Sequence, residues 1–282
     1  MKLGESMARG EAQLRAGPHP DRARRDAETL LVHLIGRNRA WLLSHLDDDF
    51  EGCRSIGYAG LLERRERGEP IQYITEQTEF YGLPLRVTPD VLIPRPETEH
   101  LVEAVLKRGA AFSEPRIMDL GTGSGAIAIA LAHEWPRAQL TAIDRSEKAL
   151  EVARDNAERT GFADRIRFLH GDLLEPVAAE EFEIVVSNPP YVPAADRASL
   201  AVEVREYEPA LALFAGDDGL DVYRRLIPQA CSVLAPGGLV ALEIGFGQAK
   251  RVEQLLAETG FAEIEFAHDL QGISRVAMAR RV

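Results

Sequence analysis

Apolar residues recur at helical spacing through the first part of the chain. Residues 8–16, 21–35, 39–46 and 56–68 each carry apolar side chains three and four positions apart, the period of one helix face. In the second of these segments the apolar face consists of Ala23, Ala27, Leu30, Leu31 and Leu34. We therefore predict a small helical domain over residues 1–70.

A change of composition follows at Pro70. Residues 71–95 are rich in β-branched and aromatic side chains, with Gly82-Leu83-Pro84 in their middle, and this pattern predicts a β-hairpin linker. A new helix is expected from Pro96, because proline fits the first turn of a helix and an acid such as Glu97 favours the positive end of the helix dipole.

From residue 116 onward, strand-like and helical segments alternate. Such alternation predicts parallel βαβ units with right-handed crossovers. Residues 262–270 and 274–282 are separated only by a short turn at Gly272, so these last two strands must pair antiparallel. We expect an α/β domain over residues 96–282, whose sheet has one antiparallel strand inserted at its end.

Composition and charge narrow the possible functions. Apolar residues make up 45% of the 282 residues, as in a globular protein with a sizeable core. The net charge of −12 argues against a broad basic face for nucleic acid. The two cysteines, Cys53 and Cys231, form no metal-binding spacing, so we expect free thiols and no metal. No signal peptide or membrane span is evident, which predicts a cytoplasmic protein that does not bind membranes.

A glycine-rich turn stands between the first strand of this domain and its helix. The segment "GTGSG" places Gly121, Gly123 and Gly125 where a ligand can approach the backbone without meeting a Cβ atom. The next strand ends at Asp144, where an acid can accept hydrogen bonds from ribose hydroxyls. The pattern indicates a nucleoside-containing cofactor. Its glycine spacing differs from the dinucleotide fingerprint, which disfavours an NAD enzyme.

The third strand of this domain ends in "HGDLLEP". In sheets of this type its end faces the adenine ring, so Asp172 is expected to accept the exocyclic amine and Leu173 to cover the ring. An alternative reading takes Asp172 as a simple turn residue. His170 is read as an ordinary residue at the end of a strand.

The fourth strand ends in "IVVSNPPY", a rigid turn at the edge of the sheet where ligands bind. Asn188 offers a carbonyl acceptor and two donors, while Pro189 and Pro190 hold their own carbonyls in fixed directions. Tyr191 adds a flat face for a planar group. We predict that these residues grip a planar NH2 group, either a carboxamide or a base amine.

The chemistry of an amide explains such a clamp. An amide nitrogen is a poor nucleophile, because its lone pair is delocalised into the carbonyl. Two acceptors, the Asn188 side chain and the Pro189 carbonyl, can hold both N–H groups and favour a lone pair directed at an electrophilic methyl group. Positioning of this kind can lower a barrier by up to roughly 7–11 kcal/mol in ideal cases.

These motifs resemble those of class I S-adenosylmethionine-dependent methyltransferases acting on planar NH2 groups. With "PRPETE" upstream of "GTGSG", the chain resembles, over nearly its whole length, the PrmC/HemK family of protein-(glutamine-N5) methyltransferases of class I peptide chain release factors. The resemblance implies a Rossmann-like methyltransferase domain preceded by the small helical domain and the β-hairpin linker. It also implies that the helical domain helps to dock the release factor.

The family's roles are carried over to the matching positions. The cofactor would be S-adenosylmethionine, with S-adenosylhomocysteine as product, and the substrate would be the glutamine of the release factor's Gly-Gly-Gln motif. Catalytic roles fall to Asn188, Pro189 and Tyr191, and substrate binding to these three and Pro190. Cofactor binding would involve Gly121, Thr122, Gly123, Ser124, Gly125, Asp144, Asp172, Leu173 and Asn188. The resemblance also implies that Arg95 and Glu97 border the pocket, without an assigned role.

Two other classes of function are less consistent with the sequence. A nucleic-acid methyltransferase acting on adenine N6 or guanine N2 would need a basic groove and room for an unstacked base. The arginines of residues 22–25 and 63–67 are few, lie close to acids, and read as solvated helix faces, so direct nucleic-acid binding is not expected. A non-catalytic nucleoside-binding module would leave the Asn188–Tyr191 turn without a purpose.

Overall fold

The computed structural model describes residues 1–282, apart from the side chain of Cys53. The chain forms two compact units. The first comprises Met1–Gln77 and Leu200–Tyr207, and the second comprises Thr78–Ser199 and Glu208–Val282. A docking role for residues 1–70, a linker over 71–95 and a catalytic domain over 96–282 stay predictions.

The first unit is entirely helical. Its helices are α1 (Leu3–Leu14), η1 (Pro20–Arg22), α2 (Ala23–Ile35), α3 (Arg39–Ser44), α4 (Cys53–Glu66), α5 (Ile71–Thr75) and α9 (Val202–Tyr207). The predicted apolar face of α2 packs inward, with Ala27, Leu30 and Leu31 fully buried. The first helix begins at Leu3, earlier than predicted, because Leu3 itself is buried in the core of this unit.

The prediction for residues 71–95 was only partly right. Residues 71–75 form α5 instead of a strand, because Tyr73 and Ile74 are buried and tertiary packing outweighs their β propensity. The hairpin is confined to β1 (Thr78–Phe80) and β2 (Leu83–Leu85). Its turn is Tyr81-Gly82, where both residues have positive φ, as two-residue hairpin turns require.

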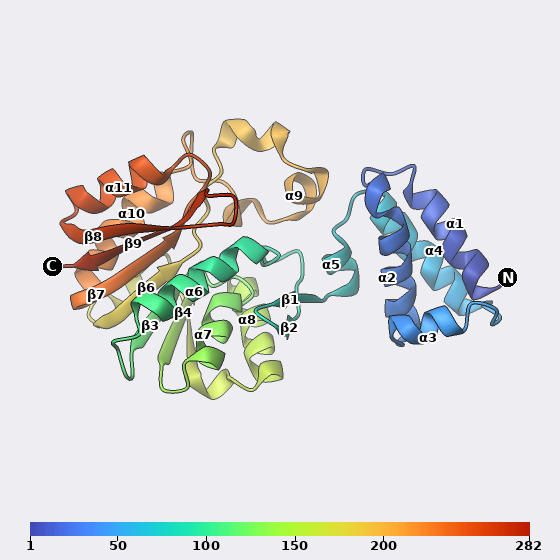
Figure 1. Ribbon diagram of the computed structural model, residues 1–282, viewed down its shortest axis with the longest axis horizontal. Helices are drawn as coiled ribbons and strands as arrows, with labels where there is room; N and C mark the ends of the chain where they lie inside the picture. Colours follow the sequence, from blue (N-terminus) through green and yellow to red (C-terminus); the bar gives the residue numbers. More distant parts are fainter. The chain divides into compact units, whose positions relative to one another are not determined.

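The second unit contains a seven-stranded sheet in the order β5-β4-β3-β6-β7-β9-β8 (Figure 1). Its strands are β3 (Arg116–Leu120), β4 (Gln139–Asp144), β5 (Ile166–His170), β6 (Phe182–Ser187), β7 (Leu234–Glu243), β8 (Phe261–His268) and β9 (Ser274–Arg281). Strands β3 to β7 run parallel, whereas β9 pairs antiparallel with both β7 and β8. The predicted α/β sheet with one inserted antiparallel strand is confirmed.

Helices cover both faces of this sheet. They are α6 (Glu99–Arg108), α7 (Ala126–Glu134), α8 (Glu147–Thr160), α10 (Asp221–Val233) and α11 (Ala249–Glu258), with short turns η2 (Pro96–Thr98), η3 (Ala163–Arg165), η4 (Glu175–Val177), η5 (Ala194–Ser199) and η6 (Ala210–Ala212). None of the described helices is both long and apolar enough to cross a membrane.

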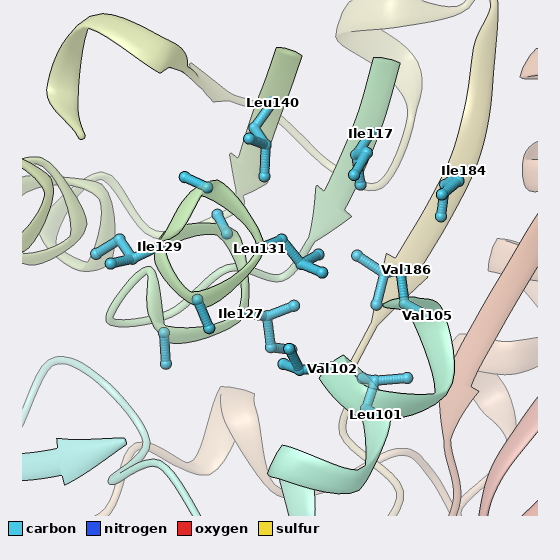
Figure 2. Packing of buried hydrophobic residues seen from close by; sticks show 14 of the residues in the cluster. Leu101, Val102, Val105, Ile117, Ile127, Ile129, Leu131, Leu140, Ile184 and Val186 are labelled. Atoms are coloured by element: carbon cyan, nitrogen blue, oxygen red, sulfur yellow. The ribbon is translucent and has the colours of Figure 1, made fainter. Parts of the chain in front are cut away.

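Successive strand residues point to opposite faces, and helices cover both faces, so most residues of the central strands are buried and apolar. In β3, Ile117 belongs to the core that contains residues of α6 and α7, and Figure 2 shows it between Leu140 of β4 and Ile184 of β6. Its neighbour Met118 belongs to the core on the opposite face, beneath α10 and α11. This double burial fixes the register of the sheet, because a shift by one residue would exchange the two faces.

Parallel pairing brings several strand ends together. Leu120 pairs with Ile143 of β4 on one side and with Ser187 of β6 on the other. The segments that follow these residues therefore leave the sheet at one carboxyl edge, where α/β proteins bind their ligands.

A buried ion-pair cluster lies inside the first unit. Arg65 of α4 is 2% exposed and donates through Nε to Asp26 of α2 at 2.6 Å. Through Nη1 it donates to Glu203 of α9 at 2.5 Å. Removing one partner of a buried ion pair strands the remaining charges in a poorly solvating environment. Arg65 thus holds together helices that lie far apart in the sequence.

We predict that Arg65→Met lowers the free energy of unfolding of this unit by about 3–5 kcal/mol, because the two carboxylates lose their shared cation. A Trp135→Phe background leaves Trp41, in α3, as the single tryptophan. Its fluorescence during urea unfolding then reports on the first unit.

The matched control is Arg67→Met in the same background. Arg67 pairs with Glu63 at 3.6 Å while both side chains are more than half exposed. Exposed pairs contribute little, so this change is expected to cost less than about 1 kcal/mol. An equal decrease in the free energy of unfolding in the two variants would show that the buried cluster stabilises the unit no more than an exposed ion pair does.

Candidate functional site

A cavity of about 270 Å3 opens at the carboxyl edge of the sheet. Small-molecule sites usually measure roughly 300–1,000 Å3, so this cavity is of comparable size. Ten residues predicted from the sequence line it: Gly121, Thr122, Gly123, Ser124, Asp144, Asp172, Leu173, Asn188, Pro189 and Pro190. The fold thus gathers the turns after four strands around one space.

The glycine turn after β3 is held by the end of β4. The N–H groups of Gly121 and Thr122 both donate to the Ile143 carbonyl, at 2.8 and 3.0 Å. Gly121 and Gly123 have φ values of 70° and 55°, which side chains rarely tolerate. A Cβ at Gly121 would meet no atom within 4 Å, so the space beside the turn is open to a ligand.

Asp144 fixes the same turn through its carboxylate. Oδ2 accepts from the Gly123 N–H at 2.8 Å, and Oδ1 accepts from the Ser146 N–H at 2.8 Å. Burial raises the pKa of this carboxyl, and these N–H groups oppose the rise. The carboxylate lines the cavity while its remaining lone pairs can accept from ligand hydroxyls.

Asp119 lies beneath the turn and is fully buried. The Thr122 hydroxyl donates to Oδ2 at 2.6 Å, whereas Oδ1 has no hydrogen-bond partner. Burial raises the pKa of this carboxyl to about 7. An unsatisfied buried carboxylate oxygen under a ligand-binding turn suits a positively charged or N–H-bearing ligand group.

The turn after β5 presents Asp172 and Leu173 to the cavity. Asp172 Oδ2 accepts from Arg225 of α10 at 2.6 Å, a partner that the sequence did not indicate. Leu173 has a positive φ of 53°, an unusual backbone conformation for a branched side chain. This backbone conformation lies where the segment turns at the cavity wall, and such strained residues are often found at functional sites.

The segment after β6 forms the opposite wall. Ser187 donates from Oγ to the Leu120 carbonyl at 2.7 Å and so ties the end of β6 to the end of β3. Asn188 follows and donates through Nδ2 to Thr98 Oγ1 at 3.0 Å. Because this bond uses the NH2 end of the amide, Oδ1 is left as an acceptor. Pro189 and Pro190 complete this wall.

Two predicted residues do not line the cavity. Gly125 instead begins α7, with a φ of 83°, and a Cβ there would lie 3.2 Å from Ala153 Cβ, so it serves close helix packing. The Tyr191 ring packs against the core beneath α10, and its hydroxyl donates to Glu243 Oε1 at 3.3 Å. Because the Tyr191 ring lies outside the cavity lining, its stacking on a substrate stays a prediction.

The two residues of "PRPETE" that had no assigned role also lie outside the cavity lining. Arg95 donates to the buried carboxylate of Glu208 at 2.5 Å, within the second unit. Glu97 is exposed.

Three residues of the site were missed by sequence reasoning. Thr98 is 4% exposed and lines the cavity beside Asn188. Asn156 of α8 is fully buried and donates from Nδ2 to the Ser124 carbonyl at 2.8 Å, which supports the glycine turn. Glu243, at the end of β7, is 3% exposed. For Glu243 the available signal was a single acid at the end of an apolar strand, whereas nothing distinguished Asn156 within the polar helix α8.

The lining fits a nucleoside-containing cofactor with a charged end. It combines a glycine turn that leaves open space with the cavity-facing carboxylate of Asp144, while Asp119, with an unpartnered carboxylate oxygen, is buried outside the lining. Among the described residues, no group of three or more His, Cys, Asp or Glu side chains is arranged to hold a metal ion.

Two protein-family models match the chain. Residues 5–75 match the PrmC N-terminal domain, and residues 96–205 match the methyltransferase small domain.

Curated relatives match nearly the whole length. The release factor glutamine methyltransferase of Geobacter sulfurreducens is 43% identical over 260 residues, covering 92% of this chain and 90% of that protein. The protein of the same name from Moorella thermoacetica is 42% identical over 282 residues, covering 100% of this chain and 99% of its own.

Solved structures show the same fold at lower identity. The hMettl16 catalytic domain, solved in complex with a MAT2A 3'UTR hairpin, is 16% identical with a TM-score of 0.58, over 83% of this chain and 84% of that one. The Thermus thermophilus 16S rRNA N2 G1207 methyltransferase, solved with AdoMet and guanosine, is 22% identical with a TM-score of 0.55. That match covers 73% of this chain and 50% of the other, and it concerns the fold alone.

Proposed function

Because the chain belongs to the family of release factor glutamine methyltransferases, we propose that it methylates the glutamine of the Gly-Gly-Gln motif in class I peptide chain release factors. The methyl group is transferred from S-adenosylmethionine to the side-chain amide nitrogen, N5. The observation that carries this proposal is the placement of Asn188 at the cavity wall, with its NH2 group engaged by Thr98.

This arrangement suits a substrate that presents N–H donors. Asn188 Oδ1 and the Pro189 carbonyl are the acceptors for the two hydrogens of the glutamine NH2 group. Holding both hydrogens directs the nitrogen lone pair away from its own carbonyl, which an amide in solution disfavours. Since no side chain of the turn is a strong base, the proton is lost after the transfer.

S-adenosylmethionine, when bound, supplies the methyl group: its S–CH3 bond breaks, sulfur keeps the electron pair, and the amide nitrogen gains the methyl and loses a proton. The Gly121–Ser124 turn would hold this molecule, with Asp144 accepting from its ribose and Asp172 and Leu173 beside its adenine. Asp119 lies below the turn and favours a cationic methionyl amino group there.

The alternative, methylation of an exocyclic amine in nucleic acid, is less consistent with the charges. In the first unit, Arg64 pairs with Glu69, Arg65 is buried among acids, and Arg67 pairs with Glu63. Arginines engaged in this way add little to a basic surface. The net charge of −12 also disfavours broad contact with phosphates. We therefore propose a cytoplasmic protein that docks its release factor through the helical unit.

The deciding experiment is the intact mass of a purified class I release factor after incubation with this protein and S-adenosylmethionine. We expect a gain of one methyl group, absent when the Gly-Gly-Gln glutamine is replaced by alanine. Methylation of tRNA or DNA with none on the release factor would instead favour the nucleic-acid alternative.

We predict that Asn188→Ala lowers kcat by about 100-fold or more, because misplacing a reacting group by 1 Å can already cost about that factor. Single-turnover methylation of the release factor measures the loss. Circular dichroism and the thermal midpoint check that the variant is folded. A kcat close to that of the wild type would exclude the clamp mechanism.

Replacing Asp144 by alanine is expected to weaken cofactor binding, since both the ribose acceptor and the support of Gly123 are lost. Isothermal titration calorimetry with S-adenosylhomocysteine should show a raised Kd. The control is Glu147→Ala, an exposed acid in the first turn of α8 outside the cavity lining, which should leave Kd unchanged. An unchanged Kd in the Asp144 variant would mean that the ribose lies elsewhere.

A further inference from the structure

The side chain of Asn188 can work as an acceptor in only one of its two orientations. Rotating the amide by half a turn replaces the carbonyl oxygen by an NH2 group of similar size, which would face the substrate's own N–H groups. In the structure Nδ2 faces Thr98 Oγ1 at 3.0 Å. Something must make this orientation more stable than the reverse, because a threonine hydroxyl can either donate or accept.

Glu243 lies on the other side of Thr98 and supplies this asymmetry. It stands at the end of β7, and its carboxylate is 3% exposed. Oε1 accepts from the Tyr191 hydroxyl at 3.3 Å, and Oε2 is buried without a partner in hydrogen-bonding geometry. The Thr98 hydroxyl interacts with this carboxylate and stabilises its ionised form, as its lowering effect on the pKa of Glu243 indicates.

An ionised carboxylate accepts hydrogen bonds and donates none. Beside it, the Thr98 proton is drawn toward Glu243, which leaves the Thr98 oxygen facing Asn188 as an acceptor. Asn188 must then offer its NH2 group to Thr98 and its carbonyl oxygen to the cavity. The orientation of the Asn188 amide then follows from the buried carboxylate, which acts on it through the Thr98 hydroxyl.

We propose that Thr98 and Glu243 are positioning residues that hold the Asn188 amide with its carbonyl oxygen toward the substrate. Neither transfers a proton or touches the methyl group. This inference rests on the proposed function, because it assigns the direction of the clamp that grips the glutamine amide.

The charge of Glu243 makes the arrangement sensitive to pH. The pKa of this carboxyl is raised to about 7: burial is the main cause, the charge of Glu97 also raises it, and Thr98, Tyr191 and Arg275 oppose the rise. Tyr223, whose hydroxyl donates to the Glu243 backbone carbonyl, has a strongly raised pKa and stays neutral, as does Tyr191.

Protonated Glu243 can itself donate a hydrogen bond, so it no longer determines the direction of the Thr98 hydroxyl. Glutamine amides do not titrate near neutral pH, so the substrate adds no ionisation of its own there. We therefore expect kcat to fall as the pH is lowered through about 7. Asp119 titrates in the same range, so the test must separate the two groups.

The first test compares Thr98→Val with Thr98→Ser in release-factor methylation. Valine keeps the shape and removes the acceptor, so kcat should fall by about 10- to 100-fold, in line with the cost of misplacing a reacting group. Serine keeps the hydroxyl and should restore most of the rate. The matched control is Thr141→Val, a buried threonine of β4 outside the cavity lining, which should keep the wild-type kcat.

Cofactor affinity separates positioning from damage to the pocket. By calorimetry, Thr98→Val should bind S-adenosylhomocysteine with the wild-type Kd, so that the loss lies in kcat. A wild-type kcat in Thr98→Val would overturn the inference. So would a loss of kcat that serine does not restore.

The second test is the pH profile of kcat at saturating cofactor for Glu243→Gln. The carboxamide cannot titrate, so the decline below about pH 7 should disappear, whereas Asp119 remains present in the variant. A decline that persists unchanged would assign it to another group and overturn the role of Glu243. Should the wild type bind cofactor and yet leave the release factor unmethylated, the proposed function fails, and this inference fails with it.

Discussion

The parallel pairing of β3 with β4 on one side and β6 on the other is the constraint on which the site depends. It places the ends of three strands at one edge, so that segments far apart in the sequence enclose the same cavity. The Ile143 carbonyl then holds the glycine turn, and the Ser187 hydroxyl joins β6 to β3. The two cavity walls formed by these segments are thereby fixed to the central strands of the sheet.

Several acids are buried at or near the carboxyl edge of the sheet. Asp119, Asp144 and Glu243 all have raised pKa values, with burial as the largest cause in each case. Such groups are costly to stability unless a ligand or a hydrogen-bond network uses them, and perturbed carboxyls therefore concentrate at functional sites. Here Asp119 underlies the cofactor turn, whereas Glu243 lies behind the substrate clamp. Under the proposed function, two buried acids with similar pKa values would act on different halves of the reaction.

Local patterns were sufficient to predict much of the fold and of the cavity lining. The alternation of strands and helices, the "GTGSG" turn and the "NPPY" turn each depend on residues close together in the sequence. Long-range partners could not be predicted in this way. Thr98 lies 90 positions from Asn188, and Glu203 lies 138 positions from Arg65. The Tyr191 ring was expected to stack on a planar substrate group because it adds a flat face to the Asn188–Tyr191 turn. In the structure its hydroxyl donates instead to Glu243, a partner 52 positions away that local patterns could not indicate.

For a nucleophile as weak as an amide, the direction of a hydrogen bond matters as much as its position. A clamp displaced by an ångström still attracts the substrate N–H groups, although it positions them poorly. A clamp with its amide reversed repels them, because donor then faces donor. Whether Asn188 attracts or repels the substrate N–H groups depends on Glu243, which lies outside the cavity lining and whose ionised carboxylate can only accept hydrogen bonds. Rigid prolines set where the acceptors lie, and the Thr98–Glu243 pair sets which end of Asn188 becomes one.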